Sequence, residues 1–133
     1  MSVLRLSTNV RNARLNALNT ALGANATIKL YTGPMAASPD VAATGTLLGT
    51  LTCGAAFGTV ANGVLTAGAI SNDDAADADG VVAWARLATS SGVGVIDVDV
   101  TDMVGDGVIK MNTVTISLGG PLQISSFSFT EPA

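Results

Sequence analysis

The sequence contains no histidine at all and a single cysteine, Cys53, among its 133 residues. Without histidine the chain cannot build a Ser-His-Asp or Cys-His nucleophile pair, and it offers no imidazole to a metal ion. One cysteine cannot form a disulfide within the chain, so the sequence predicts no disulfide framework. We therefore expect no catalytic residue and no metal site, and we expect Cys53 to be a small buried apolar side chain.

Aromatic and charged residues are also scarce. The chain is 48% hydrophobic but only 4% aromatic, so its core must consist of aliphatic side chains. Charged residues make up 12%, about half of the usual share. A surface so poor in charge suits a freely soluble protein, and it also suits a subunit that buries part of its surface against partners.

The few charges are unevenly distributed. The net charge of −4 argues against a partner made of nucleic acid. Four of the six cations precede the first acid, Asp40, whereas residues 73–106 hold eight of the ten acids and one cation, Arg86. Opposite charge at two ends of a small domain favours head-to-tail contacts or docking on a charged partner.

Long apolar runs are missing as well. Residues 1–16 lack the continuous apolar segment of a signal peptide, and no run of about eighteen apolar residues occurs elsewhere. We therefore expect synthesis in the cytoplasm and no contact with a membrane.

One helix is predicted near the N-terminus. Ser7 or Thr8 is a plausible N-cap, and Gly23 is a typical C-terminal signal. On a helical wheel four asparagines (Asn9, Asn12, Asn16 and Asn19) share one side, and the apolar residues occupy the other (Val10, Leu15, Ala17, Leu18, Ala21 and Leu22).

Two arginines of this helix, Arg11 and Arg14, fall inside the apolar arc. In one interpretation their charged ends reach solvent at the edge of the arc. In the other, residues 1–25 form an arm or helix that faces an acidic partner, and Arg5, Arg11 and Arg14 are the candidate partner interface. Deleting residues 1–22 would then leave a folded β domain.

The clearest folding unit is a hairpin over residues 81–100. Ile96, Val98 and Val100 alternate with Asp97 and Asp99, which is the period of a strand with one buried face. The run 81–87 contains the only tryptophan, Trp84, and a short connection at residues 90–92 contains glycine. We expect an antiparallel hairpin with one buried and one solvated face, and we expect Trp84 to be buried.

Further strands are predicted over residues 27–32, 46–53, 56–61, 64–69, 108–111, 113–118 and 122–130. Asn62-Gly63 predicts a type I′ hairpin turn. A change of apolar parity predicts a β-bulge at Ser125-Ser126, and Met103 and Val104 are expected to plug the core from the loop over 101–107. The sequence thus predicts a mainly β fold, an antiparallel β-sandwich or jelly roll of about eight strands with one short N-terminal helix. Residues 26–133 would form the sandwich, in a single domain overall.

Carboxylates are the remaining candidates for chemistry. Asp97 and Asp99 have a spacing that suits acid–base work on a sugar, but one tryptophan and one tyrosine do not line a sugar cleft. The acidic loop over residues 71–79 resembles a calcium loop only in composition. With Gly80 at the invariant glycine, Ala75 and Arg86 stand where the first and last ligands belong. We interpret it as a solvated loop and expect no cofactor.

Two stretches, IKLYTGPMAASPDVAATGTLLGTLT (28–52) and GGPLQISSFSFT (119–130), resemble small virion proteins of tailed bacteriophages, and the segment 57–69 extends the likeness. The resemblance implies a non-enzymatic structural subunit. The role it most suggests is a capsid decoration (cement) protein on the capsid exterior, which binds the major capsid protein and forms a dimer or trimer. It carries over no catalytic residue.

Two alternatives remain open at this point. The chain is another virion component, such as a neck, tail or head-fibre subunit, or it is a carbohydrate- or receptor-binding module. The second alternative requires exposed aromatic side chains, and most of the few aromatics are needed in the core.

Overall fold

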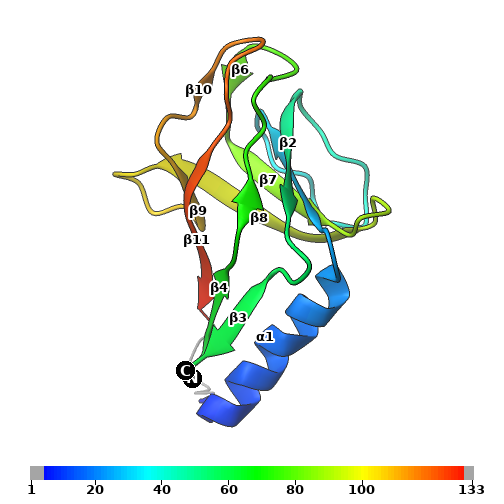
Figure 1. Ribbon diagram of the computed structural model, residues 1–133, viewed down its shortest axis with the longest axis vertical. Coiled ribbons are helices and arrows are strands. Elements are labelled where there is room, and N and C mark those ends of the chain that lie inside the picture. Colours follow the sequence, from blue (N-terminus) through cyan, green and yellow to red (C-terminus); the bar gives the residue numbers. More distant parts are fainter. Residues whose placement is uncertain (1–4, 131–133) are drawn as a thin grey trace.

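The computed structural model describes residues 5–130. Its elements in chain order are α1 (Thr8–Leu22), β1 (Thr27–Tyr31), β2 (Leu47–Cys53), β3 (Gly58–Ala61), β4 (Val64–Ala67), β5 (Ile70–Ser71), β6 (Gly80–Val81), β7 (Trp84–Ala88), β8 (Gly94–Asp102), β9 (Ile109–Met111), β10 (Thr115–Ile116) and β11 (Ile124–Thr130). Figure 1 shows the helix below a body of strands. The fold is mainly β, a β-sandwich with one N-terminal helix, as predicted.

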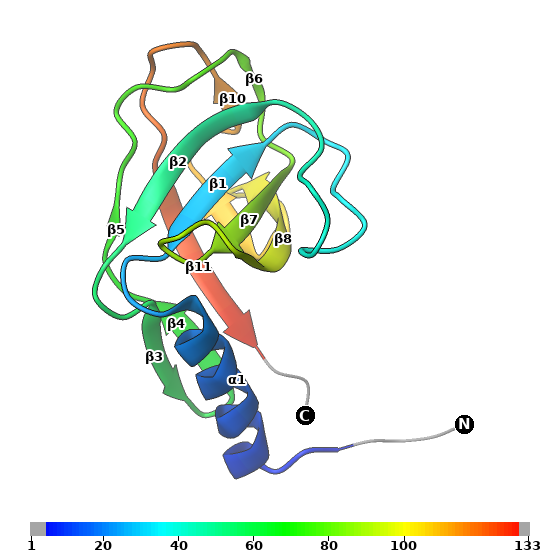
Figure 2. The same ribbon diagram turned by 90° about the vertical axis from the view of Figure 1, so that its right-hand side faces the viewer.

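The strands form a large curled sheet and a small second one. The nine-stranded sheet has the order β3-β4-β11-β9-β8-β7-β1-β2-β5, and β10 pairs with β6 separately. Strands β4 and β5 lie at or near opposite ends of this order, yet only Gly68 and Ala69 separate them in the chain. The sheet must therefore curl back on itself, as Figure 2 shows. Among the described pairs, β8 and β9 alone run parallel.

Aliphatic side chains fill the space that the curled sheet encloses. Fully buried positions come from α1 and from most of the strands, with Phe57 and Phe127 in edge-to-face contact at a centroid distance of 5.3 Å. This is the core that the composition predicts, and Cys53 is one of its buried members.

The predicted central hairpin is present over β7 and β8, with Arg86 opposite Asp97 and Trp84 opposite Asp99. Two details differ from the prediction. Strand β6 pairs with β10 instead of continuing the hairpin. All five residues of β7 are buried, so the face expected to be solvated is covered. The segment 32–46 covers it, and local sequence periodicity gives no sign of that cover.

Two local predictions about turns are confirmed. Asn62 and Gly63 have φ values of 52° and 76°, which is the left-handed conformation that a type I′ turn requires. The pairing of β11 with β9 shifts register between Ile124 and Ser126, where the bulge was predicted.

The expectation for Met103 and Val104 is wrong. They are 49% and 92% exposed instead of plugging the core. The carboxylate of Asp102 accepts hydrogen bonds from the N–H groups of Val104 (3.0 Å) and Gly105 (3.1 Å). This Asx turn directs the loop into solvent before the chain returns as β9.

The helix has the predicted ends. Ser7 accepts a hydrogen bond from the N–H of Val10 at 3.2 Å, and Gly23 follows the last turn with φ of 69°. The docking face, however, differs from the predicted apolar arc. Leu15 and Leu22 are buried, whereas Val10 is 46% exposed.

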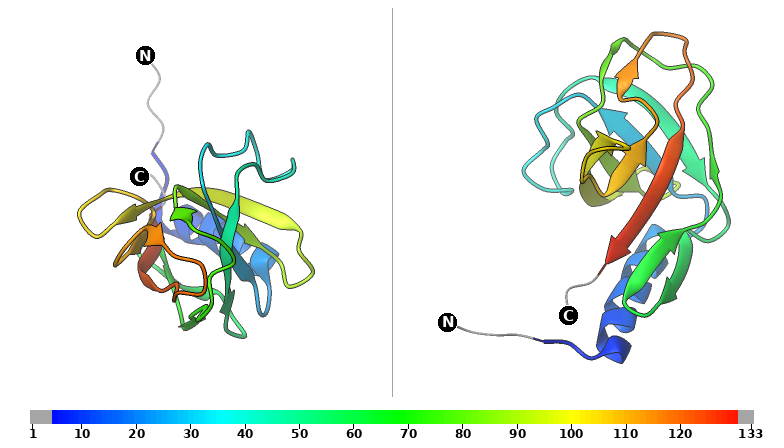
Figure 3. Two further views of the ribbon diagram at one scale, coloured as in Figure 1. Left: turned by 90° about the horizontal axis from the view of Figure 1, so that it is seen from above. Right: turned by 90° about the vertical axis from the view of Figure 1, so that its left-hand side faces the viewer.

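Asparagines on the side opposite the predicted apolar arc dock α1 on the β3–β4 hairpin (Figure 3). The amide of Asn19 bonds both backbone groups of Gly58, at 3.1 and 3.2 Å, and Oδ1 of Asn12 accepts the N–H of Gly63 at 2.8 Å. Strand β3 is the edge of the sheet, so its outward backbone groups need partners. The amide side chains supply them, and a hydrophobic pattern cannot show this.

Because Leu15 and Leu22 belong to the same core cluster as the strands, α1 is part of the core. We therefore now expect deletion of residues 1–22 to unfold the protein, which replaces the expectation of a dispensable arm. Residues 1–4 of that segment lie outside the described part of the chain.

Replacing Leu15 by alanine tests the role of the helix. Its side chain is 1% exposed, so Leu15→Ala should lower the free energy of unfolding by about 2–5 kcal/mol. The matched control is Val10→Ala on the exposed side of α1, for which we expect a change within about 0.5 kcal/mol. Urea unfolding followed by circular dichroism measures both. Equal, small losses would mean that α1 does not support the core.

Candidate functional site

The most connected polar group in the described structure is the ion pair of Arg86 and Asp97, which face each other across β7 and β8. Nε and Nη2 of Arg86 donate to Oδ1 and Oδ2 of Asp97 at 2.8 and 3.1 Å, and the two side chains are only 10% and 5% exposed. The hydrogen bond to Asp97 raises the pKa of Arg86 above its usual value, against the opposing effect of burial. The pair is bidentate, the strong geometry for Arg and a carboxylate.

The remaining donors of Arg86 hold the segment 32–46, which we call the strap. Nη1 donates to the carbonyl of Val41 at 2.6 Å, and Nη2 donates to the carbonyl of Ser38 at 3.0 Å. A buried Arg thus satisfies carbonyls of a loop that has no strand partner of its own. The strap is fastened to the outer face of β7.

Beneath the strap lie Tyr31 and Trp84. Their rings stack at 4.8 Å between centroids, and the guanidinium of Arg86 lies 5.5 Å from the centroid of Trp84. The indole N–H of Trp84 donates to the carbonyl of Thr32 at 2.9 Å, and Trp84 is 1% exposed, as predicted. Burial raises the pKa of Tyr31. Trp84 therefore binds the strap and is too buried to present a platform for a ligand.

The acidic loop uses two of its carboxylates for structure. Asp73 accepts the N–H groups of Thr50 and Ala75, each at 3.0 Å, and Asp79 accepts the N–H of Leu118 at 2.6 Å. Asp74 and Asp77 are exposed. In residues 5–130 no three Cys, Asp or Glu side chains gather as a metal site would require.

The other carboxylates considered for chemistry are separated by their environment. Asp97 is buried against Arg86, whereas Asp99 is exposed and accepts the N–H of Val108 at 3.0 Å. Cys53 is 3% exposed, and burial raises the pKa of its thiol to about 11, so the thiolate is scarce near neutral pH.

The predicted partner residues occupy different surroundings. Arg5 and Arg14 are exposed. Arg11 is half-buried and faces its own hairpin: a Cβ built on Gly63 would lie 2.5 Å from its Nη1, and its Nη2 donates to Thr8 at 3.2 Å. Arg11 thus contacts the hairpin on which α1 docks, and Arg5 and Arg14 are the exposed members of the set.

Large apolar side chains stand exposed at the ends of three connections. Val93 in the β7–β8 turn is 63% exposed, Val104 before β9 is 92% exposed, and Leu118 after β10 is 66% exposed. The three connections point in different directions in Figure 1. We call Val93, Val104 and Leu118 the apolar tips. Sequence reasoning did not identify them as exposed, although each of the three stands next to a glycine in the sequence.

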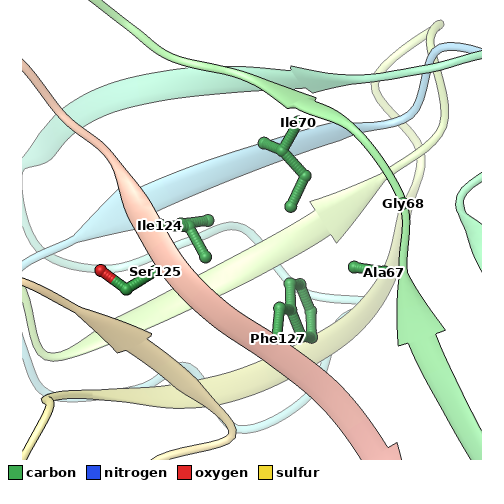
Figure 4. A pocket seen from close by; sticks show the side chains of 6 residues that line it. All are labelled: Ala67, Gly68, Ile70, Ile124, Ser125 and Phe127. Carbon is green, nitrogen blue, oxygen red and sulfur yellow. The ribbon is translucent and has the colours of Figure 1, made fainter.

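The cavities are small. One, of about 140 Å³, lies where β4 leaves β11 and is lined by Ala67, Gly68, Ile70, Ile124, Ser125 and Phe127 (Figure 4). Another of similar volume is lined by Met111, Asn112, Thr113, Pro121 and Gln123. Pockets for drug-sized ligands usually measure roughly 300–1,000 Å³. Neither cavity has room for such a ligand.

None of the described helices is long and apolar enough to cross a bilayer. Comparison with protein-family models, with curated proteins and with solved structures found no match for this chain.

The hydrogen bonds from Arg86 to the strap can be tested by removing the charge of Arg86. Arg86→Met leaves the carboxylate of Asp97 buried without a partner, so we expect a loss of about 3–5 kcal/mol in the free energy of unfolding. The double variant Arg86→Met/Asp97→Leu removes that unpaired charge and should recover most of the loss. In both variants the carbonyls of Ser38 and Val41 lack their donor, so thermolysin should cut the strap faster than in the wild type. A double variant as resistant as the wild type would show that Arg86 does not hold the strap.

Proposed function

We propose that this chain is a non-enzymatic structural subunit of a tailed-phage virion, most specifically a capsid decoration (cement) protein that binds the major capsid protein from outside. The observation that carries the proposal is the set of apolar tips. An exposed Val or Leu side chain gains free energy when a partner subunit covers it. The likeness of residues 28–52 and 119–130 to small virion proteins supplies the phage setting.

Several carboxylates of the chain form structural hydrogen bonds, which supports a binding role over a catalytic one. Asp73, Asp79 and Asp99 accept backbone N–H groups, and Asp97 is paired with Arg86. Carboxylates used in this way order the loops that contain them, which lowers the entropy lost when a partner binds.

Side-chain hydrogen bonds hold the backbone at each of the apolar tips before binding. Asp102 fixes the turn that carries Val104, and Thr89 Oγ1 accepts the N–H of Val93 at 3.2 Å. A loop that is already ordered loses less conformational entropy when it binds. This favours repeated attachment of many copies to a regular surface.

Reconstitution on phage heads tests the proposal. Purified protein should bind heads that lack it, and cryo-electron microscopy should show it at regularly spaced positions on the capsid exterior. Val93→Asp, Val104→Asp and Leu118→Asp should each weaken binding at least about tenfold, because an unpaired carboxylate would be buried at the contact. Ser90→Asp adds the same charge to the β7–β8 turn without removing an apolar side chain and serves as the control. Density at the neck or tail instead of the head would contradict the decoration role.

The N-terminal arginines are tested separately. Arg5→Glu/Arg14→Glu should weaken head binding if α1 faces acidic subunits, and wild-type binding should then fall as salt rises. Arg11 is left intact in this test because it packs on Gly63. The control is Lys110→Glu on β9, a charge reversal away from the helix. Binding that is unchanged by the double variant would place the contact on the apolar tips alone.

A further inference from the structure

The hairpin turn under α1 contains a chemically labile pair of residues. In an Asn-Gly sequence the glycine nitrogen can attack the asparagine side chain, because glycine has no Cβ to hinder the approach, and asparagine is among the thermolabile residues. Asn62-Gly63 is such a pair, and Asn62 is exposed at the tip of β3–β4.

In the folded protein the nucleophile of this reaction, the backbone nitrogen of Gly63, is not free to react. Gly63 is buried, and its N–H donates to Oδ1 of Asn12 at 2.8 Å. The guanidinium of Arg11 lies against the same glycine, so α1 covers the turn from above. Base must remove the Gly63 proton before the nitrogen can attack, and both the hydrogen bond and the cover oppose that step.

We propose that Asn62-Gly63 is a deamidation site that helix α1 keeps unreactive, and that the reaction begins when the first turns of α1 leave the hairpin. The deprotonated Gly63 nitrogen forms a bond to Cγ of Asn62, and the Cγ–Nδ2 bond breaks with release of ammonia. Water then opens the succinimide at either carbonyl and leaves aspartate or isoaspartate at position 62. The net change replaces the amide NH₂ by OH from water and needs no oxidant.

Isoaspartate at position 62 would favour further separation of α1 from the β3–β4 hairpin. Isoaspartate adds one carbon to the main chain within a two-residue turn, which displaces Gly63 from Asn12 and Arg11. The positive φ values of Asn62 and Gly63 fit the two-residue turn of the unmodified chain. Conversion therefore loosens the contact of α1 with the β3–β4 turn.

Peptide mapping by mass spectrometry tests the proposal on the full chain in mildly alkaline buffer. The native wild type should convert at least about tenfold more slowly than the urea-unfolded chain. Asn12→Ala should raise the native rate roughly fivefold, the factor expected for one lost hydrogen bond. Asn12→Asp keeps an acceptor for the Gly63 N–H and should stay protected. Asn62→Gln assigns the signal, since it should abolish the conversion.

The matched control is Asn19→Ala, which removes a different α1–hairpin bond and leaves Gly63 with its acceptor. It should accelerate conversion less than Asn12→Ala does. Equal acceleration by both, or native conversion as fast as in the unfolded chain, would overturn the proposal. Should Asn12→Ala fail to fold, hydrogen exchange of the Gly63 amide in the wild type decides: protection like that of β3–β4 amides supports the proposal, and unprotected exchange overturns it.

Discussion

The ion pair of Arg86 with Asp97 is the constraint on which the outer face of the sheet depends. A charge this buried is costly unless it is fully paired, and Arg86 meets that condition by bonding Asp97 and two strap carbonyls at once. The same bonds hold the strap over Tyr31 and Trp84. Strand β7 is consequently buried on both faces, which lets a chain with few aromatic residues bury its only tryptophan completely. Arg86 thus fastens a loop over the outer face of β7.

Helix α1 covers the edge strand β3, whose outer backbone groups have no neighbouring strand. Edge strands usually avoid further pairing through charge, proline or a bulge. Here the amide of Asn19 bonds the N–H and the carbonyl of Gly58, as a neighbouring strand would, while Leu15 and Leu22 fill the space below. Polar and apolar contacts of α1 therefore come from one face. The arrangement ties the edge of the sheet to the core, and it explains why a helix so rich in asparagine packs at all.

Local patterns in the sequence predicted what depends on neighbouring residues. Ser7 and Gly23 marked the helix ends, Asn62-Gly63 the turn, and the parity change the bulge near Ser125. Long-range pairing escaped prediction. The Asp97 side of β8 looked solvated because a carboxylate normally is, and the docking role of Asn12 and Asn19 requires a backbone partner some forty to fifty residues away. Arg86, a single arginine inside the apolar run 81–87, was the available signal for this ion pair. A cation at a buried position needs a partner, and the facing strand of the hairpin can supply one.

The low content of charge also limits how this surface can bind. Because charged residues make up only 12% of the chain, steering by charge is weak, and affinity must come largely from burial of apolar area. Each apolar tip is small, and Val93, Val104 and Leu118 lie on connections that point in different directions (Figure 1). One compact ligand cannot cover all three. Several neighbouring subunits can, and contacts that are weak singly become strong when they form together on a fixed surface. Rigid loops with apolar ends are therefore better matched to a lattice of repeated subunits than to a single small partner.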